Sequence, residues 1–290
     1  MKKYLKLIRA NHWLKNVLIF LPLFFSGSLF QGNNLLITFI GFVSFSFIAS
    51  CVYIINDMND IEADRKHPVK KNRPLASGAV SIRTAVFILI ALLIISTLID
   101  VKIYTLNNNI LIILIPVIYL ILNILYSIKL KHIPIIDVTV LVSGFFLRVL
   151  FGALIIGVEL SNWLYLMIIF GSFFLVFGKR RNEMLKNGDS SRKVLKIYNK
   201  EFLDKNMYVF LGLAIISYSL WCVDPSTILR VGNNYMIWSV PILVIIFMKY
   251  SLDIEGNSFG DPIDVVTSDK ILIVMILVYA LYLTGVFYVL

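Results

Sequence analysis

Charged residues and cysteines are both scarce in this chain of 290 residues. Only 15% of the residues are Asp, Glu, Lys or Arg, against roughly a quarter in soluble domains. The two cysteines, Cys51 and Cys222, fall within apolar stretches, which excludes a disulfide framework and a zinc site. An internal repeat, a low-complexity tail and a long linker are also lacking, so we expect one domain over residues 1–290.

Hydrophobic residues make up 59% of the chain. About 20 helical residues are needed to cross the hydrocarbon of a bilayer, and nine stretches approach or reach that length. They lie at about 17–31, 35–55, 84–100, 110–127, 134–157, 163–178, 207–223, 234–250 and 271–290. We therefore predict an all-α, polytopic membrane protein with nine transmembrane helices.

The basic residues indicate an orientation. All but three of the 27 Lys and Arg lie at the N-terminus or in the connections after every second stretch. The positive-inside rule places these segments in the cytoplasm, and an odd number of spans puts the C-terminus outside the inner or plasma membrane. Topology and attraction to anionic lipid explain the net charge of +10, so we expect no nucleic-acid partner. The oligomeric state is not indicated.

Residues 56–74, NDMNDIEADRKHPVKKNRP, combine four acids with six basic residues directly after the second stretch. Topology explains the bases but not the acids, which contribute little to orientation. Asp57, Asp60 and Asp64 are spaced i, i+3, i+7, so a continuing helix presents all three on one face. Two interpretations stay open: a solvated helix end, or a site for Mg²⁺ and a diphosphate, to which Asn56 adds an amide oxygen.

The same motif carries a family resemblance. NDMNDIEAD and the following DRKHPVKKNRPLASG resemble the N-D-x-x-D-x-x-x-D signature, with its basic extension, of the UbiA superfamily of intramembrane prenyltransferases. The resemblance covers essentially the whole chain. It implies a nine-helix bundle around a central cavity that opens to the cytoplasm and to lipid. The residues carried over are Asn56, Asp57, Asp60 and Asp64 for the metal, with the three aspartates as catalytic groups, and Arg65, Lys70 and Arg73 for the diphosphate. His67 and Pro68 fit a loop turn.

The chain departs from the superfamily after the sixth stretch, where a second acidic motif, D-x-x-x-D, is usual. Here the sequence is GKRRNEMLKNGD, with Lys179, Arg180 and Arg181 in place of carboxylates and Glu183 as the one acid on that turn. One interpretation is charge set by topology, with a surface ion pair of little energy. The other is a site for anions, because guanidinium groups bind phosphate through two parallel hydrogen bonds.

A ligand with a diphosphate at one end and a phosphate elsewhere fits the second interpretation, and 5-phosphoribosyl 1-diphosphate (PRPP) has that arrangement. The predicted active-site loops are then about 56–83 and 179–206. Four further segments resemble the decaprenyl-phosphate phosphoribosyltransferase branch of the superfamily. They are RANHWLKNVLIFLPLFFSG, with Ala10 in place of a family proline, YSIKLKHIPIIDV, LRVLFGALIIGV and GDPIDVVTSDK.

The resemblance implies Mg²⁺-dependent transfer of 5-phosphoribosyl from PRPP to a polyprenyl phosphate of the decaprenyl type. The product is a polyprenyl-phosphate 5-phosphoribose, a precursor of pentose donors for the cell envelope. One alternative is aromatic prenyl transfer in quinone biosynthesis, against which the missing second acidic motif argues. Another is a non-enzymatic membrane transporter or scaffold.

The remaining polar candidates each have a structural alternative. Arg148 lies inside the fifth stretch, where an ionisable side chain faces a cavity or a partner. We expect an anion there, because Asp137 is three helical turns away. Tyr126 and Lys129 at the end of the fourth stretch also fit an interfacial aromatic beside a snorkelling lysine. The candidates for the phosphate of the lipid acceptor are Lys15, Lys129 and Arg148.

Asp261, in GDPIDVVTSDK, has a structural explanation. Asp at an N-cap followed by Pro262 at the first helical position is a common helix start. We therefore expect Asp261 to cap a helix, with a secondary role in orienting the substrate cavity.

Overall fold

Apolar sequence becomes helix throughout the part of the chain that the computed structural model describes, residues 2–67, 70–187, 193–256 and 260–290. No strand occurs in these ranges. Eight of their helices are long and apolar enough to cross a membrane. They are α3 (Asn34–Asn59), α5 (Ile82–Asn107), α6 (Leu111–Ile128), α7 (Ile136–Ile155), α8 (Asn162–Asn187), α9 (Lys200–Val223), α11 (Ser239–Glu255) and α13 (Lys270–Tyr288). The predicted all-α, polytopic membrane fold is confirmed.

The first predicted span, 17–31, differs from the others. Its residues belong to η1 (Ala10–Phe20), a 3-10 segment, and to α2 (Leu21–Phe25), which is little more than one turn. Pro22 lacks a backbone N–H and stands in the first turn of α2, where a helix accepts proline without losing a hydrogen bond. Gly27, with φ 74°, then turns the chain. The count of nine spans is therefore approximate: eight long helices and this composite segment.

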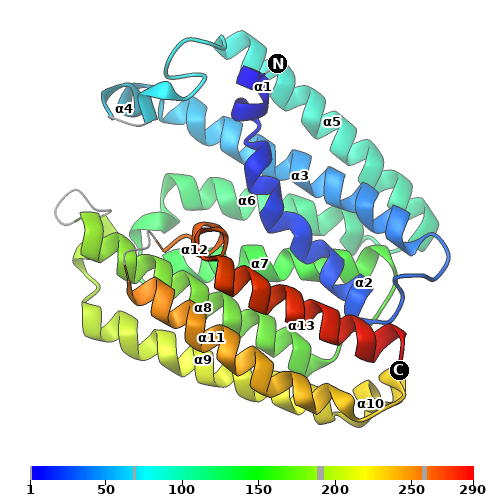
Figure 1. The fold of residues 1–290 in the computed structure, drawn as a ribbon. Helices are drawn as coiled ribbons and strands as arrows, with labels where there is room; N and C mark the ends of the chain where they lie inside the picture. The colour runs from blue at the N-terminus through cyan, green and yellow to red at the C-terminus, as the bar shows by residue number, and fades with distance from the viewer. Residues whose placement is uncertain (1, 68–69, 188–192, 257–259) are drawn as a thin grey trace. The chain divides into compact units, whose positions relative to one another are not determined.

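Short helices connect the long ones (Figure 1). They are α1 (Lys2–Leu7), α4 (Ile61–Lys66), η2 (Lys70–Asn72), η3 (Leu130–His132), η5 (Lys193–Lys196), α10 (Pro225–Val231), η6 (Tyr235–Trp238) and α12 (Pro262–Ser268). Four of them, α4, η2, η3 and α12, lie within the motifs that the sequence singled out. Pro68 of the first motif lies outside the described residues.

The chain divides into two compact units. Unit 1 comprises Met1–Leu130 and Leu147–Glu159, and unit 2 comprises Lys131–Phe146 and Leu160–Leu290. The first part of α7 thus belongs to unit 2 and the second part to unit 1. The expectation of one domain over residues 1–290 stays a prediction.

The core of unit 1 forms around α3, which packs against α5, α6 and η1. Phe45 of α3 contacts the rings of Tyr119 and Phe151 at centroid distances of 4.8 and 5.4 Å. The second part of α7 approaches η1 backbone to backbone at Gly152, where an added Cβ would lie 2.1 Å from the carbonyl oxygen of Ile19. Glycine at position 152 therefore sets how closely these two segments pack.

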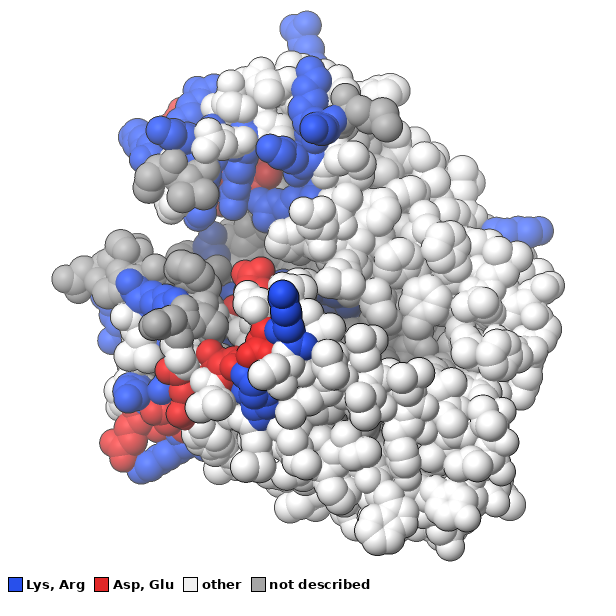
Figure 2. Space-filling view, viewed as in Figure 1, with Lys and Arg blue, Asp and Glu red and all other residues white. Residues whose placement is uncertain are grey.

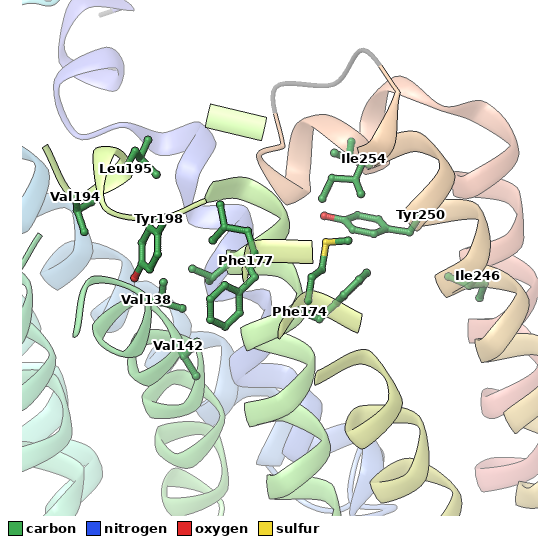
Figure 3. Close-up of a cluster of buried hydrophobic side chains, with 14 of the residues drawn as sticks. Val138, Val142, Phe174, Phe177, Val194, Leu195, Tyr198, Ile246, Tyr250 and Ile254 are labelled. Atoms are coloured by element: carbon green, nitrogen blue, oxygen red, sulfur yellow. The ribbon is translucent and has the colours of Figure 1, made fainter. Parts of the chain in front are cut away.

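The core of unit 2 lies among α8, α9, α11, α13 and the first part of α7. Figure 3 shows Tyr198 beside Val138, and Phe174 near Tyr250. The rings of Phe174 and Tyr250 are 5.6 Å apart between centroids. This cluster fixes the end of α8 that carries the basic run 179–181.

Large apolar side chains stay exposed on the long helices. Phe87 of α5 is 74% exposed and Leu281 of α13 is 71% exposed. Monomeric soluble proteins rarely expose extended apolar patches, whereas lipid tails accept them. These faces agree with a multi-pass membrane protein.

Candidate active site

The acidic motif lies where α3 ends. Asn56 and Asp57 belong to the last turn of α3, Asp60 separates it from α4, and Asp64 lies on α4. The helix that the spacing predicts is interrupted at Asp60, whose φ is −101° and ψ 9°. Helical hydrogen bonds still bracket the break, since Asp60 N donates to Asn56 O at 3.0 Å and Asp64 N donates to Asp60 O at 2.8 Å. The interruption therefore leaves Asp57 and Asp64 on the same side.

Two arginines bind these carboxylates. Arg73 Nη1 donates to Asp57 Oδ1 at 3.1 Å and to Asp64 Oδ2 at 2.6 Å. Arg9 Nη2 also donates to Asp57 Oδ1. Asp57 and Asp64 are only 2% and 3% exposed, so both negative charges are compensated within a largely buried cluster. Among the described residues, the structure thus brings together the predicted residues Asp57, Asp64 and Arg73.

Arg9 was not among the predicted site residues. It is the first residue of RANHWLKNVLIFLPLFFSG, the segment of the family resemblance from which Lys15 was predicted as a site residue. The signal was therefore present, because this arginine begins a motif that the family resemblance had already identified. What the sequence could not supply was the contact with Asp57, 48 positions further along the chain.

The donor chemistry of the cluster fits a hard divalent cation. Asn56 Oδ1 is buried and has no hydrogen-bond partner among the described residues. This amide oxygen and the carboxylates of Asp57, Asp60 and Asp64 are the oxygen ligands that Mg²⁺ prefers. In this structure arginine cations bind two of the carboxylates, and the described residues contain no preformed group of three His, Cys, Asp or Glu that would hold a metal.

The other predicted diphosphate ligands lie around the same loop. Arg65 Nε donates to the carbonyl oxygen of Ala76 at 3.1 Å, which ties α4 to the following turn. Lys70 is exposed at the start of η2, and its backbone N–H donates to His67 Nδ1 at 3.3 Å. The loop-turn interpretation of His67 is confirmed. Among the described residues, neither Arg65 nor Lys70 forms a side-chain hydrogen bond or an ion pair with Asp57 or Asp64.

Arg148 lies in a buried polar pocket of unit 1. Its Nε donates to Asn16 Oδ1 at 2.7 Å and its Nη2 donates to Tyr119 Oη at 2.9 Å. The guanidinium also lies over the rings of Tyr119 and Phe45, at 4.8 and 5.4 Å from their centroids. Asn16 and Tyr119 were not predicted for this role. Their hydrogen bonds and ring faces explain how a cation is held inside α7.

Three further candidates occupy separate positions in unit 1. Lys15 is half-buried in η1, Tyr126 is half-buried near the end of α6, and Lys129 is the exposed C-cap of α6. Their assignment to the acceptor phosphate stays a prediction.

The basic run of unit 2 forms a buried ion-pair network. Arg180 Nε donates to Asp137 Oδ2 at 2.8 Å, and its Nη1 donates to Glu183 Oε2 at 2.6 Å. Arg180 is 0% exposed, so the interpretation as a weak surface pair is wrong for this residue. The cause is the packing of α8 against the first part of α7, which removes the guanidinium from water.

Tyr198 completes this network. Its hydroxyl donates to Asp137 Oδ1 at 2.8 Å and accepts from the backbone N–H of Ile135 at 2.6 Å. Burial raises the pKa of Tyr198 to about 12, so the phenol stays protonated near neutral pH. Asp137 lies in the segment YSIKLKHIPIIDV. Neither Asp137 nor Tyr198 was predicted as a site residue.

Lys179 binds the residue that the sequence predicted as a cap. Lys179 Nζ donates to Asp261 Oδ2 at 2.8 Å, and Asp261 Oδ1 accepts from Ile263 N at 3.2 Å at the start of α12. The capping interpretation of Asp261 is confirmed. Gly260 has φ 79°, and a Cβ there would lie 3.0 Å from Lys179 Cα, so glycine permits this approach of α12 to α8.

Charge is concentrated on part of each unit. Figure 2 shows Lys and Arg gathered over the region of α1 and α4, and mixed Lys, Arg, Asp and Glu around the C-terminal end of α8 and α12. Most of the remaining visible surface carries no charge. The charged groups thus coincide with the two motifs, and the rest of the visible surface suits lipid.

The sequence and the fold resemble those of known proteins. A model of the UbiA prenyltransferase family matches residues 17–258, which include the acidic motif, Arg148 and the basic run. The chain belongs to the UbiA prenyltransferase family. The resemblance stated from the motifs is confirmed, and the chain is a membrane enzyme of a transferase family.

Two relatives in the family have the same name. The chain is 32% identical to decaprenyl-phosphate phosphoribosyltransferase of Corynebacterium glutamicum, over 98% of this chain and 86% of the relative. It is 31% identical to decaprenyl-phosphate phosphoribosyltransferase of Mycobacterium tuberculosis, over 92% of this chain and 88% of the relative. Both alignments extend well beyond the acidic motif and include both units.

A solved UbiA structure shares the fold. The UbiA homolog from Archaeoglobus fulgidus, bound to DMAPP and Mg²⁺, superposes with a TM-score of 0.70 at 22% identity. The superposition covers 99% of this chain and 100% of that chain. At this identity the likeness shows the fold alone.

Proposed function

We propose that this UbiA-family enzyme transfers 5-phosphoribosyl from PRPP to a polyprenyl phosphate. The observation that carries the proposal is the cluster in which Arg9 and Arg73 meet Asp57 and Asp64. Such a cluster offers carboxylates for a divalent cation and guanidinium groups for the phosphates that accompany it. The names of the relatives from Corynebacterium glutamicum and Mycobacterium tuberculosis support the choice of substrates.

Within unit 1, Asp57, Asp60 and Asp64 are the residues that we propose to hold Mg²⁺, with Asn56 as a further oxygen donor. When bound, Mg²⁺ supplies Lewis-acid stabilisation of the negative charge on a departing diphosphate. Arg73 orients the two buried carboxylates and has further N–H donors for phosphate oxygens. Arg65 of α4 and Lys70 at the start of η2 add positive charge to the same region.

The basic run of unit 2 supports a phosphate-rich donor. The second acidic motif of the superfamily is replaced by Lys179, Arg180 and Arg181, with Glu183 beside them. Asp137 and Glu183 compensate the charge of buried Arg180, whereas the Lys179 side chain is 27% exposed. Lys179 is therefore the residue of this run that we propose for direct binding of an anion.

The acceptor needs little activation. A phosphate monoester has a second pKa of about 6, so polyprenyl phosphate is already anionic near neutral pH and attacks C1 of the ribose without a general base. The diphosphate leaves from the opposite face, so the configuration at C1 inverts. Arg148, Lys15 and Lys129 are the proposed ligands of the acceptor phosphate, and the exposed apolar faces let the isoprenoid tail stay in lipid.

The proposed setting is the plasma membrane, with the N-terminus and the basic connections in the cytoplasm. PRPP is a water-soluble, highly charged compound, so the bases of residues 56–83 must face the compartment that contains it. Labelling of single cysteines introduced at Lys70 and at Asn233, in sealed vesicles, tests this orientation.

The proposed function is tested with PRPP labelled in its ribose. Membranes containing the expressed chain are incubated with Mg²⁺, the labelled PRPP and a polyprenyl phosphate, and label is counted in the organic extract. We expect Mg²⁺-dependent label in lipid for the wild type. Asp57→Asn keeps the side-chain shape but removes the charge, and we expect it to lower the rate at least about 100-fold.

Asp100→Asn is the matched control. Asp100 is also a buried aspartate of unit 1, but its carboxylate accepts from Ser44 Oγ at 2.6 Å and has no arginine partner among the described residues. We expect this variant to keep transfer activity. Prenylated product from a prenyl diphosphate and an aromatic acid, with no label transferred from PRPP, would overturn the proposal.

A further inference from the structure

A basic cavity of about 510 Å³ lies in unit 1 at the N-terminal helix α1. Its charged lining consists of Lys2, Lys6, Arg9 and Arg73, and His12 is beside them. Among the described residues, no carboxylate lines it. A cavity of this size accommodates a small phosphorylated metabolite or the head of a phosphorylated lipid.

Four cations around one cavity repel one another. This repulsion is stronger in a partly enclosed cavity than in bulk water, because less solvent screens the charges. Asp57 and Asp64 compensate Arg9 and Arg73, but Lys2 and Lys6 form no ion pair with any described residue. The cavity therefore keeps a positive charge that an anion would neutralise.

Contacts within unit 1 hold Arg9 in place. Its backbone is left-handed, with φ 49° and ψ 51°, a conformation that non-glycine residues rarely adopt. Ser50 Oγ of α3 donates to the carbonyl oxygen of Ile8 at 2.8 Å, directly before Arg9. The Arg9 guanidinium also lies 4.7 Å from the centroid of the Tyr53 ring. These contacts fix Arg9 between Asp57 and the cavity.

We propose that this cavity binds a phosphate group, with Lys2 and Lys6 as donors that do not contact the carboxylates. Arg9 and Arg73 have several N–H donors each, so they can bind the carboxylates and the phosphate together. The phosphate belongs either to a sugar phosphate or to the head of a polyprenyl phosphate. That the ligand is a substrate rests on the proposed function, whereas the affinity for phosphate rests on the cavity alone.

The test measures binding without catalysis. The full chain is placed in phosphatidylcholine nanodiscs in the presence of EDTA, so that metal cannot bridge ligand and carboxylates. Calorimetry with ribose 5-phosphate forms one arm. The other arm compares polyprenyl phosphate with the uncharged polyprenol, by native mass spectrometry of the nanodiscs.

The variant pair uses three lysines of α1. Lys2→Gln combined with Lys6→Gln removes two cavity charges, and we expect phosphate to bind about tenfold more weakly, because both lysines are exposed and water screens their charges. Lys3→Gln is the control. Lys3 is on the same helix but donates to the carbonyl oxygen of Ala79 and does not line the cavity, so its replacement should leave binding unchanged.

The two arms identify the source of the phosphate. Weakened binding of ribose 5-phosphate alone assigns the cavity to the sugar donor, and weakened binding of polyprenyl phosphate alone assigns it to the lipid acceptor. Unchanged binding in both arms overturns the proposal. If the double variant does not fold, protection of wild-type Lys2 and Lys6 from an amine-reactive reagent gives the same information, with Lys3 as reference.

This result is separable from the transfer assay. A chain that transfers label but shows neither weakened binding nor lysine protection refutes the cavity assignment and leaves the proposed function standing. A chain that binds phosphate through Lys2 and Lys6 but transfers no label refutes the proposed function and leaves the cavity assignment standing.

Discussion

Asp137 and Arg180 form a buried ion pair within unit 2. Asp137 Oδ2 lies 2.8 Å from Arg180 Nε, and the two side chains are 0% and 1% exposed. Glu183 accepts a hydrogen bond from Arg180 Nη1, and the Tyr198 hydroxyl donates one to Asp137 Oδ1. This arrangement anchors Arg180 of α8 to the first part of α7, so Arg180 is part of the core rather than of a surface ion pair, whereas Lys179 beside it stays partly exposed.

Removing one partner of this pair should be costly. Asp137→Ala removes the carboxylate that accepts from Arg180 Nε while the guanidinium stays buried, and loss of one buried partner typically costs about 3–5 kcal/mol. We expect the free energy of unfolding in detergent to fall by that order. The control is Glu201→Gln, which breaks an exposed pair with Lys205 and should cost less than about 1 kcal/mol. Equal effects of the two substitutions would contradict the burial of the pair.

The sequence predicted the elements whose signal is local. Apolar runs of sufficient length became α3, α5 and the other long helices, because burial of backbone polar groups in lipid leaves few alternatives to a helix. The N-cap at Asp261 was predictable for the same reason, since its signal lies in two adjacent residues. The composite segment at 17–31 was predicted wrongly as one spanning helix. Its length and hydropathy indicate such a helix, and the prediction gave Pro22 too little weight.

The site was predictable in its residue types but not in its pairings. The spacing of Asp57, Asp60 and Asp64 indicated a carboxylate cluster, and family resemblance added Arg73. The contact of Arg9 with Asp57 depends on a left-handed residue and on Ser50 and Tyr53 of α3, none of which has a sequence signature. Arg180 and Asp137 are 43 positions apart, and their burial follows from tertiary packing alone.

Gly152 should be essential for packing within unit 1. A Cβ at this position would meet the backbone of Ile19, which cannot move aside as a flexible side chain does. We expect Gly152→Ala to lower the free energy of unfolding by at least about 1–3 kcal/mol. Gly171→Ala is the control, because nothing lies within 4 Å of its added Cβ and alanine favours a helix. Thermal unfolding in detergent distinguishes the two, and a stable Gly152→Ala protein refutes the close approach of α7 to η1.

Arg148 should not be replaceable by lysine. Lysine keeps the charge but loses the planar fork that donates to Asn16 and Tyr119 and lies over two aromatic rings. We expect Arg148→Lys to cost about 2 kcal/mol in unfolding free energy and to raise the KM for polyprenyl phosphate. Arg230→Lys, at an exposed position of α10, should change neither quantity. A normal KM in a destabilised Arg148→Lys protein would restrict Arg148 to a structural role.

Removal of divalent metal should stop transfer without unfolding the protein. Arg9 and Arg73 compensate the buried charges of Asp57 and Asp64, so chelation leaves neither carboxylate without a partner. We expect EDTA to abolish label transfer and to shift the thermal midpoint by less than about 3 °C, which corresponds to roughly 1 kcal/mol in a chain of this size. The Arg73→Gln variant loses part of that compensation, and its midpoint should rise on adding Mg²⁺ by more than that of the wild type. A large fall of the wild-type midpoint in EDTA would show that metal, and not arginine, balances these carboxylates.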